Sequence, residues 1–95
     1  MMRRLFGERT KQIPLVSTKP IYGHTLGASS ALNVAAVVLM LNADYIIPTI
    51  NIDENRVAEG FNHQANRGSS RALRSGVAVS FGMGGQNTAI ALRKE

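Results

Sequence analysis

The stretch LGASSALNVAAVVLML, from Leu26 to Leu41, has the greatest consequence for the fold, because it is small or apolar nearly all the way round a helix. A helix that is apolar on every face is predicted to be buried on every face. The run Asn42-Ala43-Asp44 is expected to end it. The longest apolar part, Ala31–Leu41, is interrupted by Asn33 and is shorter than the roughly 20 residues that a bilayer requires, so we expect no membrane span.

Extended segments flank this helix on both sides. Ile13–Ser17 is predicted to be a short buried strand that enters a loop at Thr18–Thr25. After the helix, Tyr45–Ile52 is expected to be extended, because its proline disfavours helix and cannot donate to a central ladder. Residues 53–75 are polar, and we interpret them as a surface excursion in which His63 is solvated. A structureless excursion of this length is uncommon within a compact domain, which is a first indication that neighbouring protein is missing.

The end of the sequence predicts a β-hairpin. Val77, Val79 and Phe81 alternate with small residues and share one face of a predicted strand. A second apolar segment, Asn87–Arg93, follows across the turn Gly82–Gly85, whose three glycines permit positive φ.

The composition is that of one small globular domain, which we assign to residues 1–95, with 44% hydrophobic and 18% charged residues. One helix buried on all sides, together with three or four apolar strands, needs more cover than 95 residues provide. Either a second chain completes the core or this is part of a larger fold. We expect an α/β fold in which a central buried helix packs with a short mixed sheet that ends in the hairpin.

Composition also limits the location and the partners. The absence of cysteine excludes disulfides, thiolate metal sites and a cysteine nucleophile within this sequence, and favours a reducing compartment. No apolar core follows the basic opening Met1–Phe6, so we expect no signal peptide and a cytoplasmic location. The net charge of +5 is spread along the chain, and no aromatic residues alternate with the basic ones. A solvated surface explains this best; an acidic protein partner ranks second and nucleic acid last.

Two loops carry residues suited to chemistry. Lys19 and His24 lie on the predicted strand-to-helix connection, where the helix N-terminus and a nearby ammonium both disfavour imidazolium. A neutral imidazole there could donate a hydrogen bond to a developing oxyanion; the alternative is a loop histidine that caps backbone groups. The turn Gly82–Gly85 could present backbone N–H groups to an anion, or serve only as a hairpin turn.

Three collinear motifs resemble the C-terminal end of the β-ketoacyl-acyl-carrier-protein synthases. Ser17–Ala28 matches the family pattern of Ser-Thr-Lys, three residues, then Gly-His-x-x-Gly-Ala. Pro48–Asn51 matches its Pro-Thr-x-Asn bend, and Phe81–Asn87 matches Phe-Gly-x-Gly-Gly-x-Asn. The resemblance covers nearly the whole chain apart from residues 53–75, and it implies the C-terminal part of a thiolase-like fold.

The resemblance implies roles in a decarboxylative Claisen condensation. His24 matches the histidine that hydrogen-bonds the malonyl thioester carbonyl, and Lys19 matches the lysine that organises the site electrostatically. The loop Gly82, Met83, Gly84 and Gly85 matches the gating loop, whose Met83 N–H would supply part of an oxyanion hole. Phe81 and Asn87 are the supporting residues at its two ends.

Departures from the family pattern indicate a divergent member. The nucleophilic cysteine and the other catalytic histidine are absent from this sequence. Met83 replaces the usual gating phenylalanine, and methionine remains apolar but is more flexible. Asn33 stands where the family has a glutamate linked to the lysine, so a buried Lys19 would lose its carboxylate partner. Ser30 replaces a glycine at the helix entry.

The resemblance also sets expectations for activity and partners. We expect the chain alone to be inactive as an acyltransferase and to require the missing N-terminal ketosynthase portion or a partner chain. We expect an oligomer, acyl carrier protein as partner, and substrates carried on phosphopantetheine, with no other cofactor and no metal. The alternative function is a non-catalytic interaction subunit that complements a partner synthase or binds acyl carrier protein.

Overall fold

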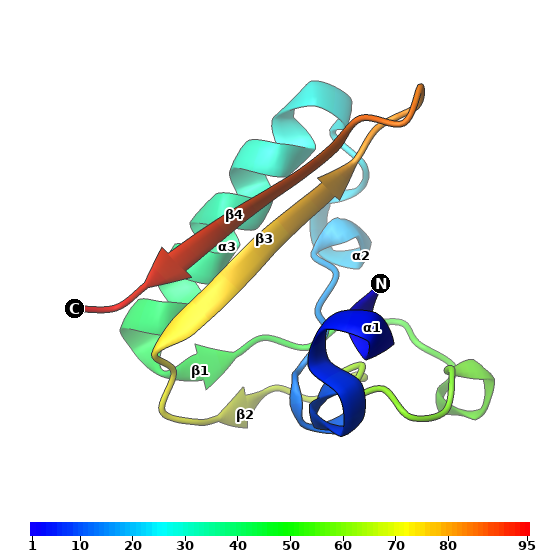
Figure 1. Cartoon of the computed structure of the whole chain (residues 1–95), viewed down its shortest axis with the longest axis vertical. Coiled ribbons are helices and arrows are strands. Elements are labelled where there is room, and N and C mark those ends of the chain that lie inside the picture. Colours follow the sequence, from blue (N-terminus) through cyan, green and yellow to red (C-terminus); the bar gives the residue numbers. More distant parts are fainter.

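The computed structural model describes residues 1–95 and places one long helix along an antiparallel hairpin, with a group of short elements beside them (Figure 1). In chain order the elements are α1 (Met2–Phe6), the 3₁₀ helix η1 (Gly7–Gln12), α2 (Lys19–Tyr22), η2 (Leu26–Ala28), α3 (Ser29–Ala43), β1 (Tyr45–Ile46), η3 (Glu54–Arg56), β2 (Ser69–Ser70), β3 (Ser75–Phe81) and β4 (Asn87–Arg93). Strands β1 and β2 form one antiparallel pair, and β3 and β4 form the other. The predicted combination of a helix with a terminal hairpin is confirmed.

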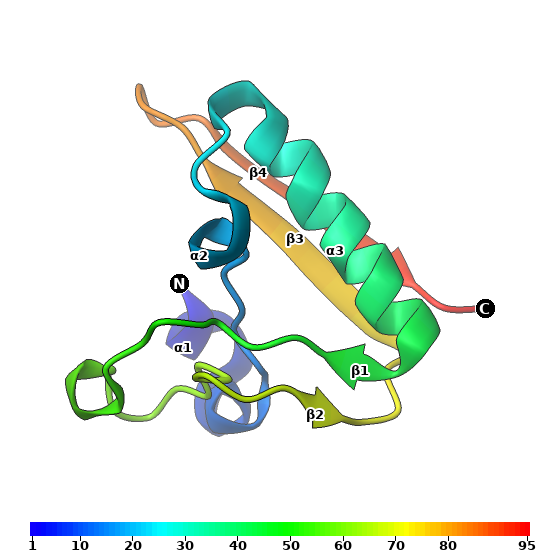
Figure 2. The same cartoon turned by 180° about the vertical axis from the view of Figure 1, so that it is seen from behind.

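The core lies between α3 and the hairpin, as both views of the chain show (Figure 2). Val37 and Leu41 of α3 and Ala78 of β3 form its buried centre. Helix and strand approach closely where β3 has no side chain: a Cβ added at Gly76 would lie 2.7 Å from Val37 Cγ1. The small residues of β3 thus let the helix lie directly against the sheet.

The prediction that α3 is buried on every face is wrong for this chain. Leu39 is 67% exposed and Val38 is 40% exposed, because only one side of the helix packs on the hairpin. The helical stretch Leu26–Ala43 is also longer than the apolar run in the sequence, and by length and composition alone it suffices to cross a bilayer. Core helices of soluble proteins share these properties, so the feature by itself assigns no membrane span.

The hairpin has the predicted strands and an open apolar face. Phe81 pairs with Asn87 at the turn, and Ser75 pairs with Arg93 at the far end. Ala78 faces α3, so the alternation of a strand directs Val77 and Phe81 to the opposite side, where they are 52% and 67% exposed. This uncovered face agrees with the expectation that the apolar elements need more cover than the chain provides.

The strand predicted at Ile13–Ser17 does not form. Pro14 makes only an isolated parallel bridge with Asn62, beside which the Leu15 N–H donates to the Asn62 carbonyl at 2.7 Å. The Ser17 N–H donates to Thr49 Oγ1 at 2.8 Å instead of to a backbone carbonyl. The segment is held by single bonds to two different neighbours, which is too few for a ladder.

Residues 53–75 contain more contacts than an excursion of solvated loop would. They include η3 and β2, and Ala65 forms a parallel bridge with Thr49. His63, which we expected to be solvated, lies with its ring centroid 5.9 Å from that of Phe61, and its Nε2 is buried without a hydrogen-bond partner. Arg3 of α1 covers the Phe61 ring at 5.1 Å. The contact between Arg3 and the Phe61 ring therefore holds this segment against α1.

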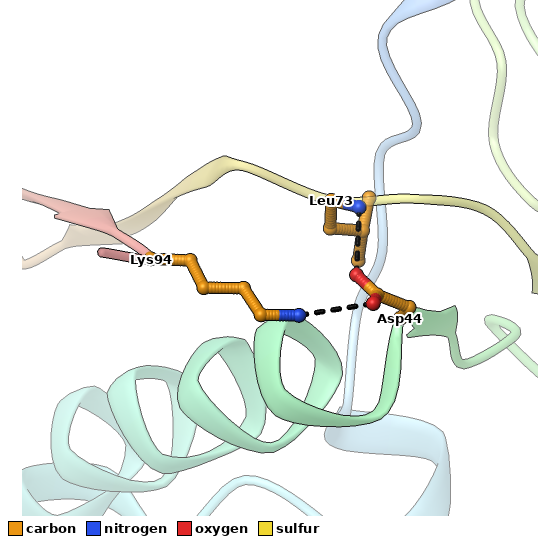
Figure 3. A network of polar contacts seen from close by, with 3 residues as sticks. All are labelled: Asp44, Leu73 and Lys94. Carbon is orange, nitrogen blue, oxygen red and sulfur yellow. Dashed lines mark hydrogen bonds and ion pairs between the residues drawn. The ribbon is translucent and has the colours of Figure 1, made fainter.

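Asp44 ends α3, as predicted, and joins the helix end to two later segments (Figure 3). It adopts the left-handed conformation with φ 49°. Its Oδ1 accepts the Leu73 N–H at 2.9 Å, and its Oδ2 pairs with Lys94 Nζ at 2.9 Å. The Asp44 carbonyl also accepts the Arg71 N–H at 2.9 Å. The hydrogen bond from Leu73 and the pairing with Lys94 lower the pKa of the Asp44 carboxyl below its usual 3.8.

This pKa predicts an acid-sensitive stability. Because the folded-state pKa of Asp44 lies below the unfolded value, the contribution is present above pH 3.8 and is lost as pH falls through the folded-state pKa. Asp44→Asn keeps an acceptor for Leu73 and removes the charge, so its thermal midpoint should fall less than that of the wild type between about pH 6 and about pH 2. Thermal unfolding followed by circular dichroism measures the difference; parallel curves would contradict the assignment.

Candidate active site

The two segments predicted to carry chemistry lie at the same end of the molecule. The connection from α2 through η2 into α3 and the turn between β3 and β4 both lie at the N-terminal end of α3 in the two views (Figures 1 and 2). Because β3 runs along α3 in the opposite direction to the helix, the turn after β3 lies at the N-terminal end of α3. The fold therefore brings the His24 end of the first motif and the turn of residues 81–87 to one end, whereas α2, which Lys19 opens, lies farther along α3 (Figures 1 and 2).

His24 is exposed and held through one ring nitrogen. Its Nδ1 accepts the Leu26 N–H at 3.1 Å and lies 3.0 Å from Ser29 Oγ. Since Nδ1 accepts, the proton of a neutral imidazole resides on Nε2. Leu26 has φ 50°, a conformation that non-glycine residues rarely adopt. The local capping that stood as the alternative role for this histidine is therefore real, and it leaves Nε2–H able to donate.

Ser29 is a site residue that the sequence reasoning missed. It is 8% exposed, and its hydroxyl accepts the Thr25 N–H at 3.1 Å and lies 3.1 Å from Thr25 Oγ1. A serine at the start of a helix commonly bonds to nearby backbone groups, and that preference could have identified it. Ser29 thus fixes the loop that carries His24 onto the first turn of α3.

Lys19 opens α2 and is exposed, with no side-chain hydrogen bond or ion pair within the chain. The buried environment that the resemblance implies for this lysine is not present within these 95 residues. Its neighbour Thr18, only 6% exposed, makes the contact with Asn33 instead: Thr18 Oγ1 donates to Asn33 Oδ1 at 3.1 Å. The Asn33 Nδ2 donates to the Val79 carbonyl at 3.4 Å. Asn33 therefore pairs with the residue before Lys19 rather than with Lys19.

The glycine turn projects from the end of the hairpin. Gly84 and Gly85 have φ 83° and 79°, which a chain reversal of this kind requires and which glycine adopts without strain. The Gly82 N–H donates to the Gln86 carbonyl at 2.7 Å and closes the turn. Met83 is fully exposed at its tip, and its N–H makes no hydrogen bond within the chain. The N–H groups of Met83, Gly84, Gly85 and Gln86 are thus all free backbone donors.

An apolar groove lies elsewhere. It has a volume of about 320 Å³ and runs along the other side of α3. The residues that line it are Thr18, Ile21, Tyr22, Leu32, Ala35, Ala36, Leu39, Met40, Ala43, Tyr45 and Ile47. Neither His24 nor the glycine turn is among them, so the groove is not the candidate active site.

Comparison with known proteins identifies the family. The sequence model described as "Beta-ketoacyl synthase, C-terminal domain" matches residues 1–53. The 3-oxoacyl-[acyl-carrier-protein] synthase 1 of Haemophilus influenzae is 35% identical over 95 residues, a match that covers 98% of this chain and 23% of the relative. The enzyme of the same name from Escherichia coli K12 is 35% identical over 94 residues, covering 98% and 22%.

A solved structure agrees. It contains a type II polyketide synthase acyl-carrier protein in complex with its ketosynthase, bound to the hexaketide. The match has a TM-score of 0.90 and 28% identity, and it covers 97% of this chain and 22% of the other. The chain spans about a quarter of the length of the relatives that it matches. From its motifs, its fold and these similarities, we conclude that it belongs to the β-ketoacyl synthase family and represents the C-terminal domain.

Proposed function

We propose that this chain supplies the Lys19, His24 and glycine-turn half of a decarboxylative Claisen condensation site. The observation that carries the proposal is the hydrogen bond from the Leu26 N–H to His24 Nδ1, which directs the imidazole proton to Nε2. The contact of His24 with Ser29 places the ring at the first turn of α3, and the glycine turn lies at the same end of that helix. The nucleophilic cysteine and the second histidine belong to the rest of a complete synthase. Residues 1–95 are a partial domain of that enzyme.

The chemistry assigned to His24 is oxyanion stabilisation. When a malonyl thioester loses CO₂, the electron pair of the broken C–C bond moves to the α-carbon and the thioester oxygen. An Nε2–H donor stabilises the negative charge that develops on that oxygen. The resulting carbanion attacks the acyl thioester on the cysteine, and the cysteine thiolate leaves. His24 needs no proton transfer for this role, since its proton stays on Nε2.

The glycine turn and Lys19 have supporting roles. The free Met83 N–H is a donor for the oxyanion that forms when the acyl thioester is attacked. Phe81 and Asn87 form the cross-strand pair that supports the turn. Lys19 contributes positive charge beside the malonyl group, and the attraction between the two strengthens once other protein excludes water from the site.

The proposed partners follow from the surfaces and from the relatives. The open hairpin face of Val77 and Phe81 and the opposite face of α3 with exposed Leu39 are two surfaces that the rest of the synthase or a partner chain covers in an oligomer. Acyl carrier protein delivers the substrates on phosphopantetheine; in support, the similar ketosynthase of known structure is in complex with its acyl-carrier protein. The net charge of +5 favours an acidic carrier. Such an enzyme works in the cytoplasm.

A chimera tests the proposal directly. In it, this chain replaces the matching C-terminal segment of the Escherichia coli relative, which supplies the cysteine and the second histidine. The expected result is CO₂ release from malonyl carrier protein above that of the relative truncated before this segment. A folded chimera whose cysteine becomes acylated but which releases no CO₂ would refute the assignment. If such a chimera still bound the carrier, the interaction-subunit function would replace it.

A further inference from the structure

The contacts of Asn33 point to a role that its sequence position alone does not give. Asn33 lies on α3, one turn after Ser29, and both ends of its amide are used. The carbonyl oxygen accepts the hydroxyl of Thr18, and the amide nitrogen donates to the backbone of Val79. Thr18 directly precedes Lys19 in the first motif, and Val79 lies on the strand that leads into the glycine turn. One side chain therefore connects both halves of the candidate site.

The Val79 carbonyl is available because of the hairpin register. The Gly82 N–H donates to Gln86 at 2.7 Å, and the Lys94 N–H donates to Arg74 at 2.9 Å. The backbone N–H and C=O groups along a strand of an antiparallel pair point alternately toward and away from the partner strand. The groups of the even-numbered residues from 74 to 82 therefore point toward β4. The Val79 carbonyl consequently points away from β4. The Asn33 amide meets an acceptor that the ladder leaves free.

Only a group that is a donor and an acceptor at once fits this position. The Thr18 hydroxyl can donate to a carboxylate as well as to an amide. The Val79 carbonyl, in contrast, needs a donor, and a carboxylate would place a second negative oxygen against it. A protonated carboxyl group regains an O–H donor. The position thus discriminates between a neutral and a charged side chain of the same shape.

We propose that Asn33 is a positioning residue whose amide couples the Thr18–Ala28 segment to the β3–β4 turn, so that His24 and Met83 keep a fixed relation. The inference rests on the proposed function for its meaning, because the coupled segments are the two halves of that site. Its physical content does not depend on catalysis. It requires only that removing the Asn33 hydrogen bonds increases the mobility of both segments together.

Amide hydrogen exchange on the 95-residue chain without any substrate tests the coupling. At neutral pH, Asn33→Leu and Asn33→Asp should each raise exchange in Thr18–Ala28 and in Val79–Asn87 about fivefold, the effect of one net hydrogen bond, and leave the last turn of α3 unchanged. Below about pH 4, where the introduced carboxyl protonates, Asn33→Asp should return to wild-type exchange at the same pH, and Asn33→Leu should not.

Two further variants make the test specific. Asn42 is exposed on the same helix and makes no side-chain hydrogen bond, so Asn42→Asp should show no such pH-dependent recovery in either segment. Because Asn33→Leu can fail to fold, Thr18→Val is measured beside it. The proposal expects faster exchange of the Gly82 N–H, the bonded amide of the β3–β4 turn, in Thr18→Val, although Thr18 makes no hydrogen bond to that turn. A folded Thr18→Val with an unchanged turn, or an Asn33→Asp that matches Asn33→Leu at every pH, would overturn the proposal. Failure of the chimera to release CO₂ would leave this result standing.

Discussion

His24→Ala is expected to lower malonyl decarboxylation by the chimera about 100- to 1000-fold, the range measured for loss of a single oxyanion donor. The expectation follows from the fixed tautomer: Nδ1 is occupied by the Leu26 N–H, so Nε2–H is the only ring donor. Removing it leaves the developing enolate oxygen without that hydrogen bond. The measurement is the initial rate of CO₂ release from malonyl carrier protein under saturating substrate.

The chain offers a matched control in its other histidine. His63 lies beside Phe61 on the segment between β1 and β2, with its Nε2 buried. His63→Gln should retain decarboxylation within about threefold, provided the chimera remains folded, because a change remote from the reacting atoms removes no transition-state contact. Loss of rate in both variants would indicate a general folding defect. Full activity of folded His24→Ala would show that His24 does not have the proposed role.

Gly68→Ala adds a single methyl group and is expected to lower the free energy of unfolding by about 3 kcal/mol. This is the upper end of the cost of overpacking. A Cβ at Gly68 would lie within 2.5 Å of Tyr45 Cζ, closer still to its hydroxyl oxygen, and 2.8 Å from the Ile46 carbonyl oxygen. The Tyr45 side chain would have to rotate away from Gly68, and the Ile46 carbonyl cannot move without shifting the backbone of β1. The midpoint of urea unfolding measures the effect.

Two variants separate steric overlap from the general effect of replacing glycine. Gly27→Ala adds the same methyl group where nothing lies within 4 Å, so its unfolding midpoint should equal or exceed that of the wild type. Tyr45→Ala in the Gly68→Ala background should recover part of the loss, because the tyrosine contacts disappear and the Ile46 carbonyl remains. If Gly68→Ala unfolds at the wild-type midpoint, the close packing of β1 on β2 is not as described.

The elements that could be predicted from sequence are those whose cause is local. The density of apolar and small residues in Leu26–Leu41 predicted α3, and glycines between two apolar runs predicted the hairpin. The strand at Ile13–Ser17 could not be judged in this way, because strand formation depends on distant neighbours, here Asn62 and Thr49. The full burial of α3 was wrong for the same reason, since burial depends on which other segments cover it.

The candidate site shows the same division. Motif spacing predicted His24 and the glycine turn, and the structure places their segments at one end of α3. Their catalytic roles stay predictions. The hydrogen bond from the Leu26 N–H to the His24 ring accompanies a left-handed φ at Leu26. Leucine rarely adopts this conformation, so the sequence does not predict it. The partners of Asn33 were unpredictable because its contact with Val79 spans 46 residues and arises from hairpin register.

The bonds at Asp44 also have a consequence for how this region tolerates variation in length. Its backbone carbonyl and its carboxylate accept hydrogen bonds from Arg71 and Leu73, so residues 45–70 form a loop whose two ends are held together at Asp44. The entropy of closing such a loop rises slowly, by about 0.6 kcal/mol for each doubling of its length. Insertions within residues 55–58, where the hydrogen bonds of Asn55 and Arg56 reach only Asp53, would therefore alter the free energy of unfolding little and leave the α3–hairpin geometry in place.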